Sequence, residues 1–144
     1  MSFRKKELKQ SNKWNIAATH YLTAGFAMPI LISIAVDLLF TVPGPFIIIS
    51  SWLFSIFIGV VYSASYLNKT YIIEDVKTIA KISTIYNFVF YLVLVLNSAI
   101  KPFNDGVSGY FSTYFSIIEV WVWVVIAVLS SAIIYFTSLR FIKN

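Results

Sequence analysis

Four long apolar runs, separated by short polar connections, limit what this chain can fold into more than any other feature of its sequence. They extend over residues 16–40, 46–67, 82–100 and 115–136. Each run has roughly 19 to 25 residues, enough for an α-helix to cross a bilayer core of about 30 Å. We therefore expect an all-α integral membrane protein, a bundle of four transmembrane helices that forms one domain over residues 1–144.

The composition agrees with lipid as the surroundings of these runs. Apolar residues make up 59% of the chain and charged residues only 12%, with a mean hydropathy of +0.82. The chain has no cysteine, which excludes disulfides, thiolate metal sites and cysteine nucleophiles. The first run is longer than the apolar core of a cleavable signal peptide, about 7 to 15 residues, so we expect it to be retained as a span.

The basic residues predict the orientation of the spans. Ten of the eleven Lys and Arg residues fall on one side if the N-terminus is cytoplasmic, and only Lys101 falls outside. This predicts a multi-pass protein of a cell membrane, a bacterial inner membrane or a plasma membrane, with both termini and the basic arm 1–15 in the cytoplasm. Nucleic-acid binding has no support, because topology and attraction to anionic lipid explain the arm.

The connections predict how neighbouring spans meet. The sequence TVPGPF, residues 41–46, is so short that the first two spans should form a hairpin. Pro29 lies near the middle of the first span and should kink it. Between the second and third spans, residues 72–81 have apolar and charged positions at helical spacing. This predicts a short amphipathic helix at the cytoplasmic interface that runs into the third span and either lies on lipid headgroups or serves as a docking site.

The second span has a small residue at every fourth position, which predicts close packing against another helix. These residues are Ser51, Ser55, Gly59 and Ser63, and the serines could also donate hydrogen bonds across the contact. The hairpin makes the first span the expected partner, through Ala24, Gly25 and Ala27, and a dimer is the second possibility. His20 shares the alanine face of the first span, so we expect a helix contact there rather than a proton relay or ligand site.

Two carboxylates lie inside the predicted spans, about one turn below the external surface. These are Asp37 in the first span and Glu119 in the fourth. Asn97 reaches a similar depth in the third span and Lys101 follows one turn later, so the four groups could form an ion or proton site. The alternative is that each side chain reaches water separately near the interface.

A polar stripe along the third span should avoid lipid. Its members are Ser83, Asn87, Tyr91, Ser98 and Lys101, which fall within one sector of a helix, with Asn97 at the edge. The stripe could supply interhelical hydrogen bonds or line a polar path, and we favour the first interpretation.

No catalytic or cofactor motif is evident, so we expect neither an enzyme nor a cofactor or metal site. The favoured hypothesis is an accessory, assembly or scaffold subunit that acts through helix contacts, with lipid and other membrane subunits or further copies of itself as partners. The alternative is a homo-oligomeric channel or small transporter that uses Asp37 and Glu119 for a cation or proton. A phage-type permeabilising protein is a third hypothesis.

Overall fold

The computed structural model describes residues 7–39, 44–104 and 109–140, and within these ranges the chain is helical apart from short connections. The elements are the α-helix α1 (Gln10–Tyr21), the π-helix η1 (Leu22–Ala27), and the α-helices α2 (Met28–Leu39), α3 (Pro45–Thr70), α4 (Ile73–Asn104) and α5 (Gly109–Arg140).

The four apolar runs predicted to be helical are confirmed as long apolar helices. α1, η1 and α2 follow one another without a break, so the described chain has four helices long and apolar enough to cross a membrane: Gln10–Leu39, Phe46–Thr70, Ile73–Ile100 and Ile117–Arg140. All four extend at one end beyond the predicted runs into polar sequence, because backbone hydrogen bonding continues until a cap or proline ends it. Pro45 occupies the first turn of α3, where its missing N–H costs nothing.

The predicted disturbance at Pro29 takes the form of a π-helix just before it. Pro29 cannot donate to the carbonyl of Gly25, and its ring crowds that turn. The N–H of Met28 instead reaches back five residues, to the carbonyl of Thr23. Gly25 lies inside this wide turn, where a Cβ would approach the ring of Tyr21 within 2.5 Å. The chain therefore accommodates Pro29 by forming a wider, π-helical turn just before it.

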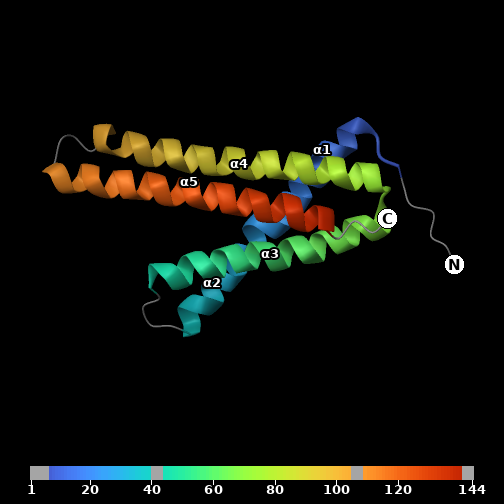
Figure 1. The fold of residues 1–144 in the computed structure, drawn as a ribbon, viewed down its shortest axis with the longest axis horizontal. Helices are drawn as coiled ribbons and strands as arrows, with labels where there is room; N and C mark the ends of the chain where they lie inside the picture. The colour runs from blue at the N-terminus through green and yellow to red at the C-terminus, as the bar shows by residue number, and fades with distance from the viewer. Residues whose placement is uncertain (1–6, 40–43, 105–108, 141–144) are drawn as a thin grey trace.

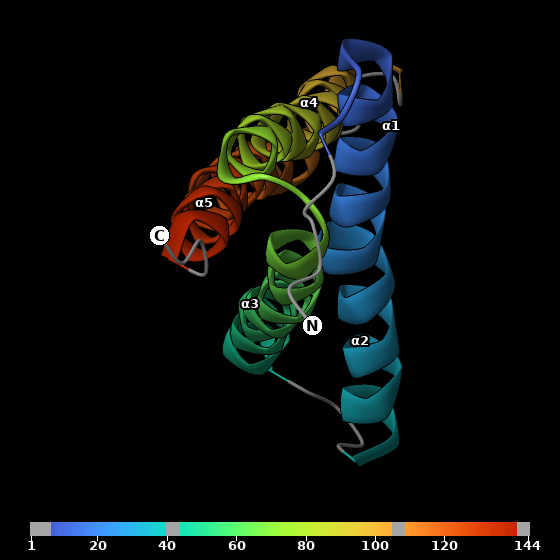
Figure 2. The same cartoon turned by 90° about the vertical axis from the view of Figure 1, so that its right-hand side faces the viewer.

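The helices form two antiparallel pairs that cross. α4 and α5 lie side by side along the molecule, while the rod of α1, η1 and α2 crosses them at a steep angle and α3 packs between that rod and α5 (Figures 1 and 2). The start of α1, the end of α3, the start of α4 and the end of α5 share one end of the molecule, hereafter the basic end. Toward the opposite end, α2 and the first half of α3 diverge from α4 and α5 (Figure 1).

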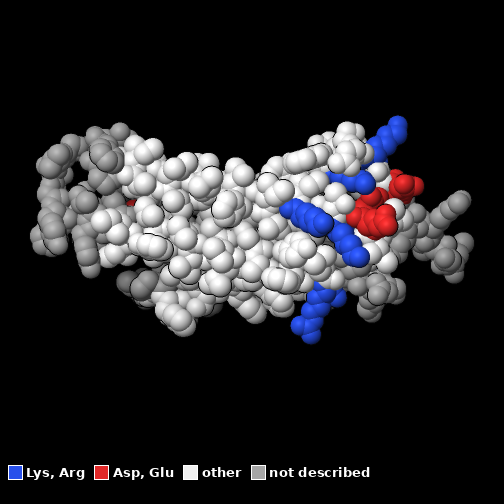
Figure 3. Space-filling view, turned by 45° about the horizontal axis from the view of Figure 1, so that its top comes forward, with Lys and Arg blue, Asp and Glu red and all other residues white. Residues whose placement is uncertain are grey.

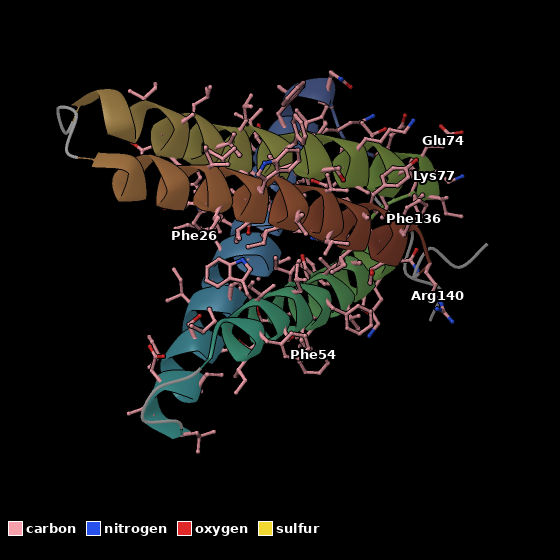
Figure 4. The ribbon with its side chains drawn as sticks, turned by 60° about the vertical axis from the view of Figure 1, so that its left-hand side comes forward. Phe26, Phe54, Glu74, Lys77, Phe136 and Arg140 are labelled. Carbon is pink, nitrogen blue, oxygen red and sulfur yellow. The ribbon has the colours of Figure 1, made fainter. Side chains whose placement is uncertain are left out.

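Charge is concentrated at the basic end. The Lys and Arg side chains gather there over the start of α4 and the neighbouring helices, while most of the rest of this face is neutral (Figure 3). The described members are Lys9, Lys13, Lys69, Lys77, Lys81 and Arg140. In Figure 4, Phe54 points outward from α3, whereas Glu74, Lys77 and Arg140 mark the basic end. The long sides of the bundle therefore present apolar side chains and the basic end presents charged ones.

The buried core contains three groups of apolar side chains. The central group joins Tyr21 and Ala24 to Ile56, Val60 and Ile134. A group near the basic end joins α1 and α3 to the first turns of α4, through residues Ala17, Leu67, Val76, Ile79 and Ile82. The third lies between α4 and α5, around Tyr91, Ile126 and Ala127.

The segment between the second and third spans is helical and runs into the third span, as predicted, because it forms the first turns of α4, which is continuous from Ile73. Its apolar residues Val76 and Ile79 are 1% and 0% exposed, since they pack against Ala17 and Leu67. The expectation that this apolar face lies on headgroups is therefore wrong, because the basic end of the bundle already covers it. Docking of a partner on the charged face of the segment stays a prediction.

Candidate functional site: a buried polar network

Polar side chains meet between the helices at several levels of the bundle. We call the set His20, Trp52, Ser63, Ser83, Asn87, Tyr91, Ser130, Ser131 and Ser138 the polar network. Its hydrogen bonds join helices that are far apart in sequence, and each one satisfies groups that would otherwise be costly to bury.

His20 connects three helices. Its Nδ1 is hydrogen-bonded to Ser63 Oγ on α3, and its Nε2 lies 3.3 Å from Ser138 Oγ on α5. The imidazole is 2% exposed. With one ring nitrogen donating and the other accepting, a neutral histidine satisfies both contacts. The structure thus places His20 at a helix contact.

Asn87 joins α4 to α5. Its Nδ2 group donates to Ser130 Oγ at 2.8 Å and to Ser131 Oγ at 2.9 Å. Its carbonyl oxygen is buried and has no hydrogen-bond partner among the described residues, as is also true of the hydroxyl of Tyr21. The amide therefore uses its donors fully and leaves its acceptor unused.

Two further hydrogen bonds involve Ser83 and Tyr91 of the stripe on α4. Ser83 Oγ donates to the carbonyl oxygen of Ala17 at 3.0 Å. Trp52 Nε1 donates to the hydroxyl of Tyr91 at 2.7 Å. Burial of the stripe is confirmed, because Ser83, Asn87 and Tyr91 are 0% exposed and Ser98 is 2% exposed. The hydrogen bonds of Ser83, Asn87 and Tyr91 all join neighbouring helices, as expected for packing.

The partners of this network on α5 could have been found from sequence spacing. Ala127, Ser130, Ser131, Ile134 and Ser138 recur at three- and four-residue intervals, so they lie on one face of the helix. The prediction used this pattern in the second span only, although the fourth span has it as well. Small and hydroxyl-bearing residues at this spacing are typical of a close helix contact.

The small residues of α3 do not all behave alike. Gly59 faces the first span, and a Cβ there would lie 2.8 Å from Ala24 Cα. Ser63 bonds to His20, whereas Ser51 and Ser55 donate to carbonyls of their own helix, those of Ile48 and Trp52.

The expectation that all three serines bond across the contact is wrong for Ser51 and Ser55. A serine hydroxyl within a helix readily finds a carbonyl three or four residues earlier. Ser55 is nevertheless buried. Ala27, which was expected to line the contact on the first span, is exposed.

A second polar contact, at the basic end, was missed by sequence analysis. Asp75 is 1% exposed, forms a 2.7 Å ion pair with Lys13 Nζ, and accepts the backbone N–H of Leu8 at 2.8 Å. Its place in the first turn of α4 also favours a negative charge. The contact ties the segment before α1 to the start of α4. Its signal in the sequence was an acidic residue at the start of a helix, together with a basic N-terminal arm that could pair with it.

The four groups predicted to form an ion site are spread over separate parts of the molecule. Asp37 is exposed near the end of α2, which packs on α3 and η1. Glu119 is half-buried on α5, which packs on α4 and α3, and α2 ends far from the start of α5 in both ribbon views (Figures 1 and 2). Asn97 is exposed on α4, and the side chain of Lys101 lies outside the described part of the chain.

The structure therefore does not bring Asp37 and Glu119 together. No group of three or more His, Asp or Glu residues that could hold a metal ion occurs within the described ranges.

Several clefts open on the sides of the bundle, including one of about 560 Å³ that is lined by α3 alone, between Phe57 and Lys69. Two others lie between α3 and a neighbouring helix. One, of about 240 Å³, lies between α1–η1 and α3 beside His20 and is lined by Ile16, Thr19, His20, Thr23, Tyr62, Ser63, Tyr66, Leu67 and Tyr71. We call it the hydroxyl cleft.

The other, of about 310 Å³, lies where α3 diverges from α5 and is lined by Ile49, Ile118, Trp121, Val122, Val125 and Ile126. We call it the apolar wedge. In the hydroxyl cleft Ser63 is hydrogen-bonded to His20, whose other ring nitrogen meets Ser138, and the described lining of both clefts contains no carboxylate.

Comparison of the chain with protein-family models, with curated protein sequences and with solved structures gave no match.

Proposed function

We propose that the protein is inserted in a cell membrane through its four long helices, with both termini in the cytoplasm, and that it acts as an accessory or scaffold subunit of a membrane complex. The concentration of Lys and Arg at the basic end supports this orientation, because basic residues are favoured on the cytoplasmic side. The membrane would be a bacterial inner membrane or a plasma membrane.

The apolar wedge is the observation that carries the accessory role. Five of its lining residues belong to α5 and one, Ile49, belongs to α3, and all six are isoleucine, valine or tryptophan. Trp121 is 65% exposed at its mouth. Association in lipid depends on packing between complementary helix surfaces, so an opening between two diverging helices suits a transmembrane helix of another subunit. Tryptophan is also a frequent anchor at protein interfaces.

The use of the interior polar groups also favours a binding role over a chemical one. His20, Asn87, Ser83 and Trp52 all form hydrogen bonds between helices, so their donors and acceptors hold the bundle together. A bundle fixed in this way would present a rigid outer surface to a partner.

Photo-crosslinking in the native host membrane tests this proposal. A photoreactive amino acid replaces Trp121 in the wedge or, as a control, Phe136, which is 67% exposed on the same helix toward the basic end. We expect one specific protein adduct from position 121 and none from position 136. Adducts to lipid alone at both positions would rule out the partner helix.

A further inference from the structure

The hydroxyl cleft has a lining unlike that of the apolar wedge. α1 and η1 contribute Thr19, His20 and Thr23, and α3 contributes Tyr62, Ser63 and Tyr66, so polar groups from two helices face one opening. Thr19, Tyr62 and Tyr66 are exposed, and Thr23 is half-buried. The cleft therefore opens sideways between two long apolar helices, within reach of molecules dissolved in the bilayer.

The hydrogen bonds of the two threonines decide what the cleft can accept. Thr19 Oγ1 donates to the carbonyl of Asn15 at 3.0 Å, and Thr23 Oγ1 donates to the carbonyl of Thr19 at 2.9 Å. Each hydroxyl hydrogen is therefore engaged within the helix, and each oxygen keeps a lone pair as an acceptor. A ligand that meets these oxygens must supply a donor.

The charge and size of the cleft further limit the kind of ligand that it can bind. None of the described lining residues is Asp, Glu, Lys or Arg, so the lining itself supplies no counter-charge to a charged head; Lys69 lines the adjoining cleft, which shares Tyr62 and Tyr66. The volume of about 240 Å³ is below the roughly 300 to 1,000 Å³ of sites that enclose a whole small molecule. The cleft suits only the head of a ligand whose tail stays outside.

We propose that the hydroxyl cleft binds the head of an uncharged amphiphile that carries a hydroxyl group. The ligand hydroxyl donates to Thr19 or Thr23, and the hydroxyls of Tyr62 and Tyr66 can donate to its other oxygens. The rings of these tyrosines cover the apolar part of the head. The hydroxyl can come from a glycerolipid or from a phenolic lipid such as a hydroquinone. Such binding needs no partner subunit, so it stands or falls separately from the accessory role.

Native mass spectrometry of the full chain in detergent micelles tests this binding with three probes. Dioctanoylglycerol has a free hydroxyl, its methyl ether lacks that donor, and an octyl hydroquinone carries phenolic hydroxyls. We expect at least one hydroxyl-bearing probe to bind about 5-fold more tightly than the methyl ether, the effect of one net hydrogen bond. The tighter of the two hydroxyl probes identifies the source of the ligand. Equal binding of the ether and both hydroxyl probes would overturn the proposal.

Matched threonine variants locate the site. Thr19→Val and Thr23→Val remove the acceptors, and the combined variant should bind the preferred probe about 5-fold more weakly. Thr84→Val is the control, because Thr84 also donates to a carbonyl four residues earlier, that of Ala80 at 2.9 Å, but lies on α4 outside the cleft.

Tyr66→Phe is a second test of the site if the threonine variants unfold. It should weaken binding of dioctanoylglycerol, which has ester oxygens that accept from the tyrosine hydroxyl. If the threonine variants fold and bind the probe as the wild-type chain does, the ligand lies elsewhere and this site is rejected. If they do not fold, unchanged binding by Tyr66→Phe rejects the site in the same way.

Discussion

The backbone of Gly59 on α3 lies directly against that of Ala24 in the first span, so close that a Cβ at position 59 would be 2.8 Å from Ala24 Cα and 3.0 Å from its carbonyl oxygen. Backbone atoms cannot give way as the end of a flexible side chain can. A larger residue must therefore force the two helices apart.

Gly59→Ala should lower the free energy of unfolding by about 1 to 3 kcal/mol, and Gly59→Leu by more, because both overpack a backbone contact. Denaturation with SDS in mixed micelles measures this. Gly44→Ala is the control, since a Cβ there meets nothing within 4 Å; because Gly44 is the N-cap of α3, the substitution should cost some stability, but less than Gly59→Ala. A Gly59→Leu protein that folds normally as a monomer and loses only self-association would assign this face to a dimer instead.

The contact between His20 and Ser63 should be measurable as a coupling energy. A double-mutant cycle with His20→Ala and Ser63→Ala should give about 0.6 kcal/mol, the average for such bonds between membrane helices. Ser65→Ala is the matched control, because Ser65 donates only to the carbonyl of Val61 on its own helix. Coupling of His20 to Ser65 as large as that to Ser63 would contradict the direct bond.

Asn87→Leu should destabilise the bundle by about 1 kcal/mol. The substitution removes two bonds to α5, but it also removes a buried carbonyl oxygen without a partner in the described chain, so the two effects partly cancel. Asn97→Leu, at an exposed position of the same helix, should change stability by less than about 0.5 kcal/mol. Equal effects at the two positions in SDS titration would argue against the buried amide contact.

Asp75→Asn should release the segment before α1 from the start of α4. The amide keeps the shape of the side chain but loses the charge that pairs with Lys13, a loss of about 1 to 3 kcal/mol for such a buried contact. Trypsin cleavage after Lys9 and Lys13 in inside-out vesicles should become faster. Glu74→Gln changes the exposed neighbour and should leave cleavage unaltered; faster cleavage in that variant as well would point to a general effect of charge.

Asp37→Asn and Glu119→Gln should leave the cation and proton permeability of protein-containing liposomes unchanged. Asp37 is exposed on α2 and Glu119 is on α5, so the two carboxylates do not form one site. Fluorescent pH and potassium indicators inside the liposomes measure the fluxes, with empty liposomes as the control. A flux above that control, abolished by either substitution, would restore the channel or transporter hypothesis.

Sequence alone determined the number of long helices, their apolar character and the buried stripe on α4. These features depend on local quantities: the length of each apolar run, the spacing of polar residues along one helix, and the backbone chemistry of Pro29 and Pro45. The spacing of small residues also predicted the packing face of α3 that carries Gly59. The serines on this face differ in their hydrogen-bond partners.

Only the tertiary structure decided which residues meet across helices. The crossing of the first span over α4 and α5 brings His20 to Ser138, 118 positions away in sequence, and buries Asp75 beside Lys13. The same crossing covers the apolar face of the segment around Val76, and the divergence of α2 from α5 separates Asp37 from Glu119. Side-chain periodicity identifies the face of one helix, but crossing angles arise from the packing of several helices at once, which no single segment encodes.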